Sequence, residues 1–425
     1  MTDEFQYRDG ILHAEDVPIP EIAKAVGTPF YLYSSRMFAA NLGAFQSALS
    51  GIDHLVCYSV KANSNVAVLR LLGNLGAGMD VVSGGEYVRA RAAGIPGDRI
   101  VFSGVGKTRD EMAAALGGGI RHFNVESEPE LRLLSEVAES HGTVAPIAIR
   151  INPDVDPGTH EKISTGKSGD KFGIPVSRVR DAYREAGQLP GIRVVGIDVH
   201  IGSQVMDLAP FRRVFRLLAD LTRVLREDGH EIRRIDAGGG LGINYRPAED
   251  PAPSPAEYCA LLADTLGHLG VEIDVEPGRF ISGNAGVMVS SVLYRKTGEA
   301  RDILVLDSAM NDLLRPAMYG AYHEIEPVIA PAENGRTSAV DIVGPICESG
   351  DTFARGRELP QLSDGDLLVF RSTGAYGAVM ASGYNSRPLI PEVLVNGEEF
   401  FVIRARIPVE DLINRDIVPE WLTAS

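Results

Sequence analysis

The sequence of 425 residues is poor in cysteine, with only Cys57, Cys259 and Cys347 scattered along it. Thiols so few and so widely spaced give neither a disulfide framework nor a zinc site, and we expect no metal. Basic residues are also in the minority, because 41 Lys and Arg stand against 57 Asp and Glu, for a formal net charge of −16. A nucleic-acid partner requires a basic face, so we expect none.

Long hydrophobic runs are absent too. No apolar stretch approaches the roughly 18 residues that a membrane span requires. The N-terminus, Met-Thr-Asp-Glu-Phe, is acidic and has no signal-peptide pattern. With the scarcity of cysteine, this favours a reducing cytoplasm and no membrane partner. Composition is otherwise ordinary, at 44% hydrophobic and 23% charged residues, which predicts a folded chain of two or three domains.

Eight short strand-like runs follow one another from residue 55 to residue 276. They are Leu55–Val60, Met79–Val82, Ile100–Ser103, His122–Val125, Pro146–Ile151, Val194–His200, Arg234–Ala237 and Glu272–Glu276. Helical patterns lie between them, clearest at Glu86–Ala93, Thr108–Leu116, Pro129–Ser140, Pro210–Asp228 and Pro255–Leu269. This alternation predicts a TIM-like (β/α)₈ barrel over residues 27–282, with a doubly wound open sheet as the alternative.

The pattern changes after Arg279. Strand-like runs then occur at Val287–Arg295, Ile303–Asp307, Ala339–Val343, Leu367–Phe370 and Phe400–Arg406, with little helix apart from a turn near Met310–Tyr319. We therefore expect an all-β barrel or sandwich domain over residues 283–425. Residues 1–26 should join it, because their strands precede the barrel and have no place in it.

Polar residues and glycines stand at the ends of the predicted barrel strands. Lys61 follows the first strand, Asp80 ends the second, His200 the sixth, and Gly238–Gly240 the seventh, while Glu276-Pro-Gly-Arg279 follows the eighth. A barrel gathers its strand ends into one mouth, where glycine amides and arginine suit a phosphate. Singly, each has a plainer explanation, such as a solvated lysine, a core histidine or a tight turn. Together they predict a phosphate-binding catalytic mouth.

Five barrel motifs occur in a fixed order: Tyr58-Ser-Val-Lys-Ala-Asn63, Asp80-Val-Val-Ser-Gly-Gly-Glu86, His200-Ile-Gly-Ser-Gln204, Gly238-Gly-Gly-Leu-Gly242 and Glu276-Pro-Gly-Arg279. Leu314-Arg-Pro-Ala-Met-Tyr319, Cys347-Glu-Ser-Gly-Asp351, Gly374-Ala-Tyr-Gly377 and Tyr384-Asn-Ser-Arg-Pro388 continue the set. The set resembles the fold-type III pyridoxal-phosphate-dependent decarboxylases, which have an alanine racemase-like fold. Within them it is most similar to the members that act on meso-2,6-diaminopimelate. The resemblance covers nearly the whole chain.

The resemblance implies pyridoxal 5'-phosphate as cofactor and assigns it a set of residues. Lys61 would form the Schiff base with the cofactor aldehyde, because only a primary amine can. Glu276 would bind the pyridine nitrogen, and His200 would stack on the ring. The phosphate would be held by Ser203, Gly238, Gly239, Gly240, Arg279 and Tyr376, and Gly278 would also belong to the cofactor site. Asp80 and Glu86 would support Lys61 and His200.

The implied reaction is decarboxylation of meso-2,6-diaminopimelate to L-lysine and CO₂, the last step of lysine biosynthesis. Cys347 would reprotonate the α-carbon. The distal substrate groups would be met by Arg279, Arg315, Tyr319, Glu348 and Tyr376. A decarboxylase of ornithine, arginine or lysine on the same fold is the alternative, with a racemase and a non-catalytic relative further behind. The family also implies a homodimer that shares its active sites, and residues 156–172 are the candidate lid.

Overall fold

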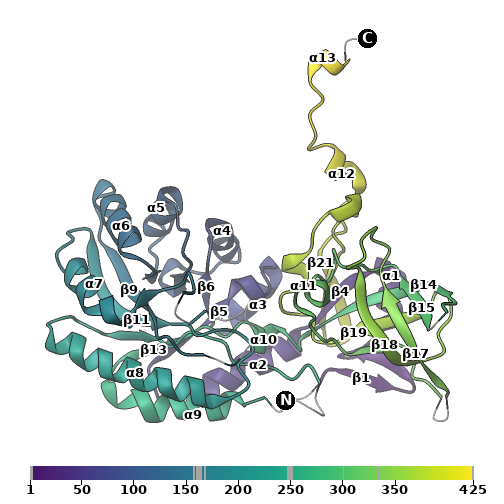
Figure 1. Ribbon diagram of the computed structural model, residues 1–425, viewed down its shortest axis with the longest axis horizontal. Helices are drawn as coiled ribbons and strands as arrows, with labels where there is room; N and C mark the ends of the chain where they lie inside the picture. Colours follow the sequence, from purple (N-terminus) through teal and green to yellow (C-terminus); the bar gives the residue numbers. More distant parts are fainter. Residues whose placement is uncertain are drawn as a thin grey trace. The chain divides into compact units, whose positions relative to one another are not determined.

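The computed structural model describes residues 3–156, 158, 165–166, 169–246, 252–299, 301–332 and 335–423. Figure 1 shows the two compact units into which the chain divides. The barrel unit comprises Phe38–Gly283, and the β unit comprises the segment up to Met37 together with the chain from Asn284 onward.

Eight parallel strands form the wall of the barrel unit. They are β5 (His54–Ser59), β6 (Gly78–Val81), β7 (Ile100–Phe102), β8 (His122–Val125), β9 (Ala145–Asn152), β11 (Ile192–Val199), β12 (Arg234–Asp236) and β13 (Glu272–Val275). Each pairs with the next, and β13 returns to pair with β5, so the sheet closes. The short β10 (Ile174–Pro175) adds to β9. This confirms the predicted (β/α)₈ barrel and excludes an open sheet.

One helix precedes the first barrel strand, and the others each follow a strand. They are α2 (Ser35–Ala48), α3 (Val66–Asn74), α4 (Gly84–Ala92), α5 (Arg109–Gly117), α6 (Glu128–Ser140), α7 (Val179–Ala186), α8 (Leu208–Glu227), α9 (Pro255–Leu266) and α10 (Arg279–Ser282). In α8, Phe211, Phe215 and Leu218 are buried at helical spacing, so one face packs inward. The side chain of Thr108 and that of Glu111 cap the start of α5 reciprocally. Among the described residues, no helix has the length and apolar composition needed to cross a bilayer.

The β unit is built mainly from antiparallel strands. They are β1 (Phe5–Arg8), β2 (Ile11–Ala14), β3 (Val17–Pro18), β4 (Phe30–Ser34), β14 (Gly286–Lys296), β15 (Asp302–Leu306), β16 (Ile325–Pro327), β17 (Thr337–Val343), β18 (Thr352–Pro360), β19 (Leu367–Phe370), β20 (Glu392–Asn396) and β21 (Glu399–Arg404). The main path runs β18-β17-β15-β14-β4-β20-β21, and β1–β3 form a small sheet of their own. The helices are α1 (Ile19–Val26), α11 (Arg315–Tyr319), α12 (Val409–Ile413) and α13 (Glu420–Thr423). The predicted all-β domain is confirmed.

Residues 27–37 lie on the other side of the boundary from the one predicted. Strand β4 pairs with β14 and with β20, which are both in the β unit. All five residues of β4 are buried. A fully buried strand has the same pattern in either sheet, so the sequence does not indicate which sheet it joins.

Candidate active site

Lys61 lies in a short 3₁₀ turn, Val60–Ala62, directly after β5. Its Nζ is 3.1 Å from Oδ2 of Asp80 on the neighbouring β6, and its side chain is 33% exposed. The Ser59 hydroxyl donates to the same carboxylate oxygen at 2.8 Å. Burial raises the pKa of Asp80, but Lys61 and Ser59 outweigh it and hold that pKa below its ordinary value. The barrel therefore presents an amine and a charged carboxylate at adjacent strand ends.

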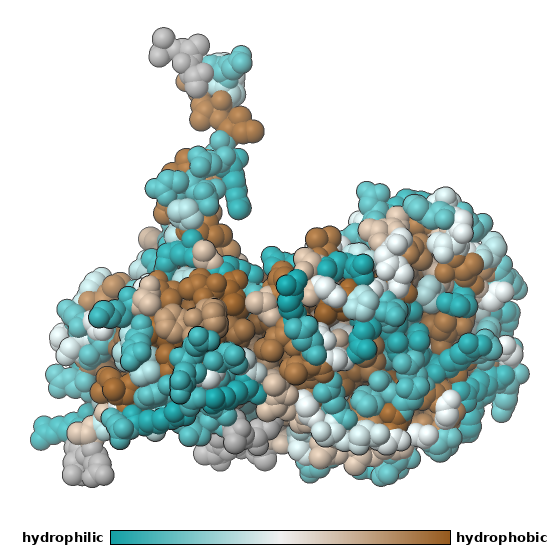
Figure 2. All heavy atoms as spheres, turned by 180° about the vertical axis from the view of Figure 1, so that it is seen from behind, coloured by the Kyte–Doolittle hydropathy of each residue, from teal (hydrophilic) through white to brown (hydrophobic). Residues whose placement is uncertain are grey.

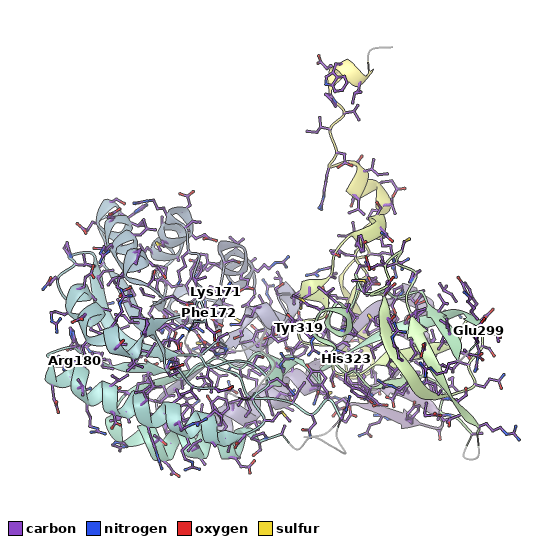
Figure 3. The ribbon with its side chains drawn as sticks, in the orientation of Figure 1. Lys171, Phe172, Arg180, Glu299, Tyr319 and His323 are labelled. Atoms are coloured by element: carbon purple, nitrogen blue, oxygen red, sulfur yellow. The ribbon has the colours of Figure 1, made fainter. Side chains whose placement is uncertain are left out.

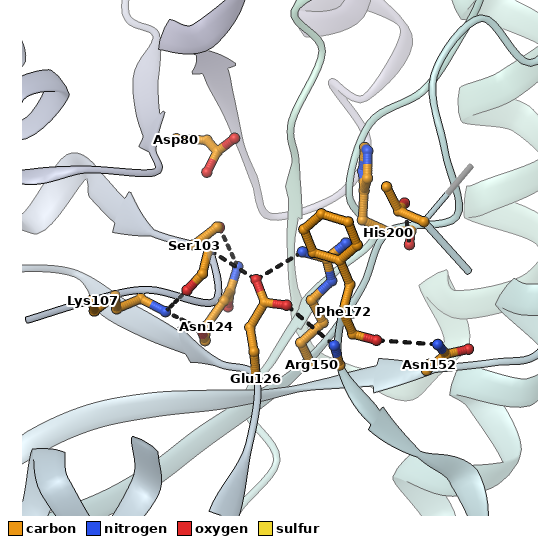
Figure 4. Close-up of polar contacts among 12 residues, drawn as sticks. Asp80, Ser103, Lys107, Asn124, Glu126, Arg150, Asn152, Phe172 and His200 are labelled. Atoms are coloured by element: carbon orange, nitrogen blue, oxygen red, sulfur yellow. Dashed lines mark hydrogen bonds and ion pairs between the residues drawn. The ribbon is translucent and has the colours of Figure 1, made fainter. Parts of the chain in front are cut away.

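Glu276 is buried just after β13 and is held in place by neutral donors. Its Oε1 accepts from the Ser103 hydroxyl at 3.3 Å and from the Asn124 amide at 3.4 Å. Asn124 also donates to Ser103, a contact that Figure 4 shows. Burial, reinforced by the buried carboxyl of Asp236, raises the pKa of Glu276 well above its ordinary value. Ser103 and Asn124 were not predicted, because single polar residues within strands carry no signal in the sequence.

His200 follows β11 at the same end of the barrel, where Figure 4 labels it. The backbone N–H of Gly239 donates to His200 Nδ1 at 3.0 Å. Nδ1 is therefore an acceptor, and the ring proton lies on Nε2. Burial, with the positive charges of Lys61 and Arg150, lowers the pKa of His200 well below its ordinary value. The imidazole is thus a neutral ring of fixed orientation.

Three glycines allow the strand ends to approach each other closely. A Cβ on Gly238 would lie 2.2 Å from the carbonyl oxygen of Val199, and one on Gly239 would lie 2.1 Å from that of Glu276. A Cβ on Gly240 would lie 2.4 Å from the oxygen of Gly202. Gly238 and Gly240 also have positive φ angles of 66° and 108°. The run Gly238–Gly240 therefore joins the loops after β11, β12 and β13.

The backbone amides of this run differ from the prediction in one respect. Gly238 N–H donates to Asp236 Oδ1 at 3.0 Å, and Gly239 N–H donates to His200. Two of the three amides expected to bind phosphate thus already have protein acceptors. No acceptor for the Gly240 amide is found within the described part of the chain. Only Gly240 retains an amide suited to the predicted cradle.

Arg279 and Ser203 come together from the loops after β13 and β11. Arg279 Nη2 and Nε donate to the Ser203 hydroxyl at 3.0 and 3.3 Å. Arg279 Nη1 donates to the Tyr245 hydroxyl at 2.6 Å, a partner that the motifs did not indicate. The preceding Gly278 is packed closely, since a Cβ there would lie 2.9 Å from Ser59 Cβ. A buried guanidinium beside a hydroxyl is suited to an anion.

Glu86 lies in the first turn of α4, and its Oε2 accepts from the Val82 N–H at 2.8 Å. Burial raises the pKa of Glu86 to about 7. The positive charge of Lys61 also acts on the Glu86 carboxyl and lowers its pKa, against the larger effect of burial. Glu86 therefore holds the loop after β6 and lies within the electrostatic influence of Lys61 and Asp80.

Glu126 is a second acidic residue that connects segments at the end of the barrel where His200 lies. Glu126 Oε1 accepts from Gly104 N–H at 2.8 Å and from Arg150 at 2.9 Å, and its Oε2 accepts from Gly173 N–H at 3.1 Å (Figure 4). The Arg150 guanidinium lies 4.9 Å from the centre of the Phe172 ring. These contacts fix the end of the predicted lid, of which residues 157, 159–164 and 167–168 lie outside the described residues.

The β unit carries the remaining predicted residues. Cys347 and Glu348 are exposed in the loop before β18, and Cys347 N–H donates to Asn385 Oδ1 at 2.8 Å. The carboxylate of Asp351 closes this loop by accepting from Met310 N–H and Ile346 N–H, each at 2.7 Å. The motif Cys347–Asp351 is thus an exposed loop that is held in place by the buried carboxylate of Asp351.

Arg315 is buried at the start of α11, and its Nη1 is 2.9 Å from His323 Nε2. Because an arginine can only donate, His323 Nε2 accepts, and its Nδ1–H donates to the Arg371 carbonyl at 2.8 Å. Figure 3 labels Tyr319, the last residue of α11, and His323, which follows the helix in the chain. Tyr376 has a φ of 56°, a left-handed conformation that is uncommon for a tyrosine. His323 was not predicted, because its role arises from a tertiary contact.

Two buried groups in the barrel have a geometry that could hold a cation: His122 with Asp236 and Asp274, and Asp198 with Asp236 and Glu276. Asp274 is already bound by Arg121 at 2.9 and 3.1 Å, which places a positive charge beside the first group. Burial and the mutual repulsion of the carboxylates raise the pKa values of all three acids in the second group. We assign no metal to either group.

Comparison with known proteins gives the chain a family. The family model described as "Pyridoxal-dependent decarboxylase, pyridoxal binding domain" matches residues 36–283. The chain is 48% identical to the diaminopimelate decarboxylase of Pseudomonas fluorescens, over 98% of this chain and 100% of that protein. It is 46% identical to that of Zymomonas mobilis, over 98% and 99%. The chain belongs to the diaminopimelate decarboxylase family.

Solved structures of this family have the same fold. The chain matches diaminopimelate decarboxylase from M. jannaschii in complex with L-lysine with a TM-score of 0.94 and 37% identity, over 99% of both chains. It matches the enzyme from Helicobacter pylori, also complexed with L-lysine, with a TM-score of 0.90 and 39% identity, over 93% and 98%.

The barrel mouth suits the cofactor of the diaminopimelate decarboxylase family, pyridoxal 5'-phosphate. Lys61 offers a primary amine, Arg279 and Ser203 form an anion-binding pair, and Glu276 is a buried carboxyl in the barrel interior. At Gly238, Gly239 and Gly240 the neighbouring backbone is so close that no side chain fits at these three positions. The chain is therefore a pyridoxal-phosphate-dependent carboxy-lyase.

Proposed function

We propose that the chain decarboxylates meso-2,6-diaminopimelate to L-lysine and CO₂, as the last step of lysine biosynthesis. The observation that carries the proposal is the Lys61–Asp80 pair, which lies at the carboxyl ends of adjacent barrel strands in a member of the diaminopimelate decarboxylase family. That two relatives were solved with L-lysine bound supports lysine as the product.

Lys61 would carry the cofactor, and Asp80 would hold the lysine amine in position at 3.1 Å. Arg279, Ser203 and the Gly240 amide would bind the phosphate. Bound pyridoxal phosphate supplies an electron sink for the carbanion left when CO₂ departs. Glu276 would bind the protonated pyridine nitrogen, because its buried carboxyl has the neutral donors Ser103 and Asn124 beside it. The neutral ring of His200 would stack without placing a second positive charge in the mouth.

Arg315 would bind the distal carboxylate of the substrate, with Arg279. His323 supports this role, because its contact at 2.9 Å orients the buried guanidinium. Glu348 would bind the distal ammonium, with hydrogen bonds from Tyr319 and Tyr376 beside it. Charge pairing at both distal groups would favour diaminopimelate over lysine, ornithine or arginine, which lack the distal carboxylate.

Cys347 would return a proton to the α-carbon after CO₂ is lost. Its exposed loop, closed by the Asp351 carboxylate, supports a residue that is presented to a site instead of packed in a core. We propose that Cys347 and Glu348 act across the interface of a homodimer, each β unit serving the barrel of its partner. In a mixed dimer of Lys61→Ala and Cys347→Ala subunits, one site then carries both defects and the other neither.

Subunit mixing tests this sharing. The two inactive variants, unfolded and refolded together, should recover part of the activity. If tagged co-purification shows that mixed dimers form, and these dimers remain inactive, shared sites would be contradicted.

We place the enzyme in the cytoplasm with no nucleic-acid partner. The free thiols of Cys57, Cys259 and Cys347 and the net charge of −16 support this.

The proposed reaction is tested by measuring CO₂ release from meso-diaminopimelate, its L,L isomer, lysine, ornithine and arginine. The meso isomer should be consumed far faster than the others. Faster release from ornithine, arginine or lysine would replace the proposal with the alternative decarboxylases. Loss of substrate chirality without CO₂ would indicate a racemase.

A further inference from the structure

The chain ends in a segment whose hydrophobic side chains are uncovered. We call residues 409–423, which include α12 and α13, the C-terminal arm. Val409, Ile413, Ile417 and Trp421 recur every four residues, and the last three are 62%, 91% and 75% exposed. Val418 and Leu422 are exposed beside them. Figure 2 shows hydrophobic residues on the surface of this segment. A run of large, exposed apolar side chains is typical of a docking segment.

The strand that precedes the arm is also uncovered. Among the described strands, β21 pairs only with β20, so its other edge is open. This edge is hydrophobic, with the sequence Phe400-Phe-Val-Ile403, and Phe401 and Val402 are about half exposed. Proteins usually cover such an edge, because an open apolar strand invites pairing with another chain. The β unit therefore carries two bare apolar features that follow each other in sequence.

The acidic arm is complementary to Arg406, which lies just after β21; within β21 itself, Glu399 is acidic and Arg404 is already bound to Glu392. The arm carries Glu410, Asp411, Asp416 and Glu420 against Arg415 alone. Arg406, just after β21, donates its hydrogen bonds to the carbonyls of residues 27–29 and not to a carboxylate. Its positive charge is thus available to an acidic segment that lies along the edge.

We propose that the arm of one subunit lies on the β21 edge of a second copy of the chain, and that the exchange is reciprocal. The area supports a dimer. Six apolar side chains at roughly 60–120 Å² each give about 500 Å² per arm. Counting the surface they cover, two exchanged arms bury about 2,000 Å², and stable interfaces bury roughly 1,200–2,000 Å². Reciprocal exchange closes the assembly at two copies and covers the β21 edge of each.

The exchange rests on the proposed two-subunit assembly and specifies what holds it together. The test of the exchange measures association of subunits, so the exchange can be wrong while the proposed reaction is right. Conversely, a dimer held by its arms could be inactive. The arm contains Trp421, the single tryptophan of the chain. Tryptophan fluorescence of the full-length holoenzyme therefore reports on the arm alone.

The test measures sedimentation and acrylamide quenching of Trp421 across a dilution series. The holoenzyme should sediment as a dimer with shielded Trp421, and dilution should expose Trp421 in parallel with dissociation. Ile413→Ser combined with Ile417→Ser should raise the dimer dissociation constant by about a hundredfold or more. Val88→Ser, at a similarly exposed position on α4, is the matched control and should leave association unchanged.

Three results would overturn the exchange. A dimer in which Trp421 is still quenched would show that the arm lies outside the interface. A monomer with shielded Trp421 at every dilution would show that the arm folds onto its own chain. Equal dimer stability in the double variant and the Val88→Ser control would show that the arm contributes nothing. The dilution series uses the unaltered chain, so it decides the matter even if a variant folds poorly.

Discussion

Replacing Gly239 by alanine should damage the cofactor site through backbone displacement alone. A Cβ at this position would lie 2.1 Å from the carbonyl oxygen of Glu276 and 2.9 Å from its carbonyl carbon. Contacts this short cannot persist, so the ends of β12 and β13 must separate. The same Glu276 carbonyl accepts from the Ser59 hydroxyl at 3.1 Å, and Ser59 also binds Asp80. The displacement should therefore reach the group beside Lys61.

The expected magnitude follows from overpacking. Forcing one extra methyl group into a closely packed site costs typically about 1–3 kcal/mol. The φ of Gly239 is not in the left-handed region, so no separate backbone strain adds to this. We expect Gly239→Ala to lower the free energy of unfolding by about 1–3 kcal/mol and to weaken pyridoxal phosphate binding by roughly tenfold or more. Urea unfolding and equilibrium dialysis measure the two quantities.

Gly43→Ala is the matched control. Gly43 lies inside α2, and a Cβ there would meet nothing within 4 Å. Alanine should stabilise that helix by about 0.5–1 kcal/mol and leave cofactor affinity unchanged. If Gly239→Ala behaved like this control, with both stability and affinity retained, the close approach of Gly239 to Glu276 could not be what shapes the site.

Four further substitutions test separate parts of the site. Burial raises the pKa of Glu86 from 4.5 to about 7, so its contribution to stability is present below pH 4.5 and is lost as the pH rises through 7. Glu86→Gln should therefore gain on the wild type by up to about 3 kcal/mol between pH 4.5 and pH 8 in urea unfolding, and parallel pH profiles would refute this. Arg279→Ala should weaken pyridoxal phosphate binding by roughly 10–100-fold but leave pyridoxal binding unchanged in dialysis, whereas equal losses would mean that Arg279 does not bind the phosphate. Arg315→Ala should cut kcat/KM on diaminopimelate far more than any trace activity on lysine, and His323→Ala should do so more weakly; equal losses on both substrates would make Arg315 a support of the fold.

The barrel could be predicted because its strands are short apolar runs bounded by glycine, proline and polar residues. Lys61, Asp80 and Glu276 stand where these runs end, and a closed barrel brings strand ends together. Strand β4 could not be placed in the same way, because its five buried residues would suit either unit. Its pairing with β14 is a long-range contact that no local pattern encodes.

The hydrogen-bond partners within the site were less predictable than the site residues themselves. Asn124 and Tyr245 acquire their roles only when distant strands meet, and neither belongs to a recognisable motif. The glycine run indicated a close backbone approach, but not that two of its amides already bind Asp236 and His200. Residue type and spacing predict which chemistry is present, while the acceptor of each donor depends on tertiary geometry.

The most direct test of the account asks which lysine carries the cofactor. Borohydride reduction of the holoenzyme, followed by peptide mapping, should place the pyridoxyl group on Lys61, whose amine lies 3.1 Å from Asp80 at the barrel mouth. Lys107 is an internal comparison, since its buried amine is already bound to Glu130 at 2.7 Å. A label on Lys61 alone, lost in Lys61→Ala, is the predicted result. A label on Lys107 or on any other lysine would contradict the account.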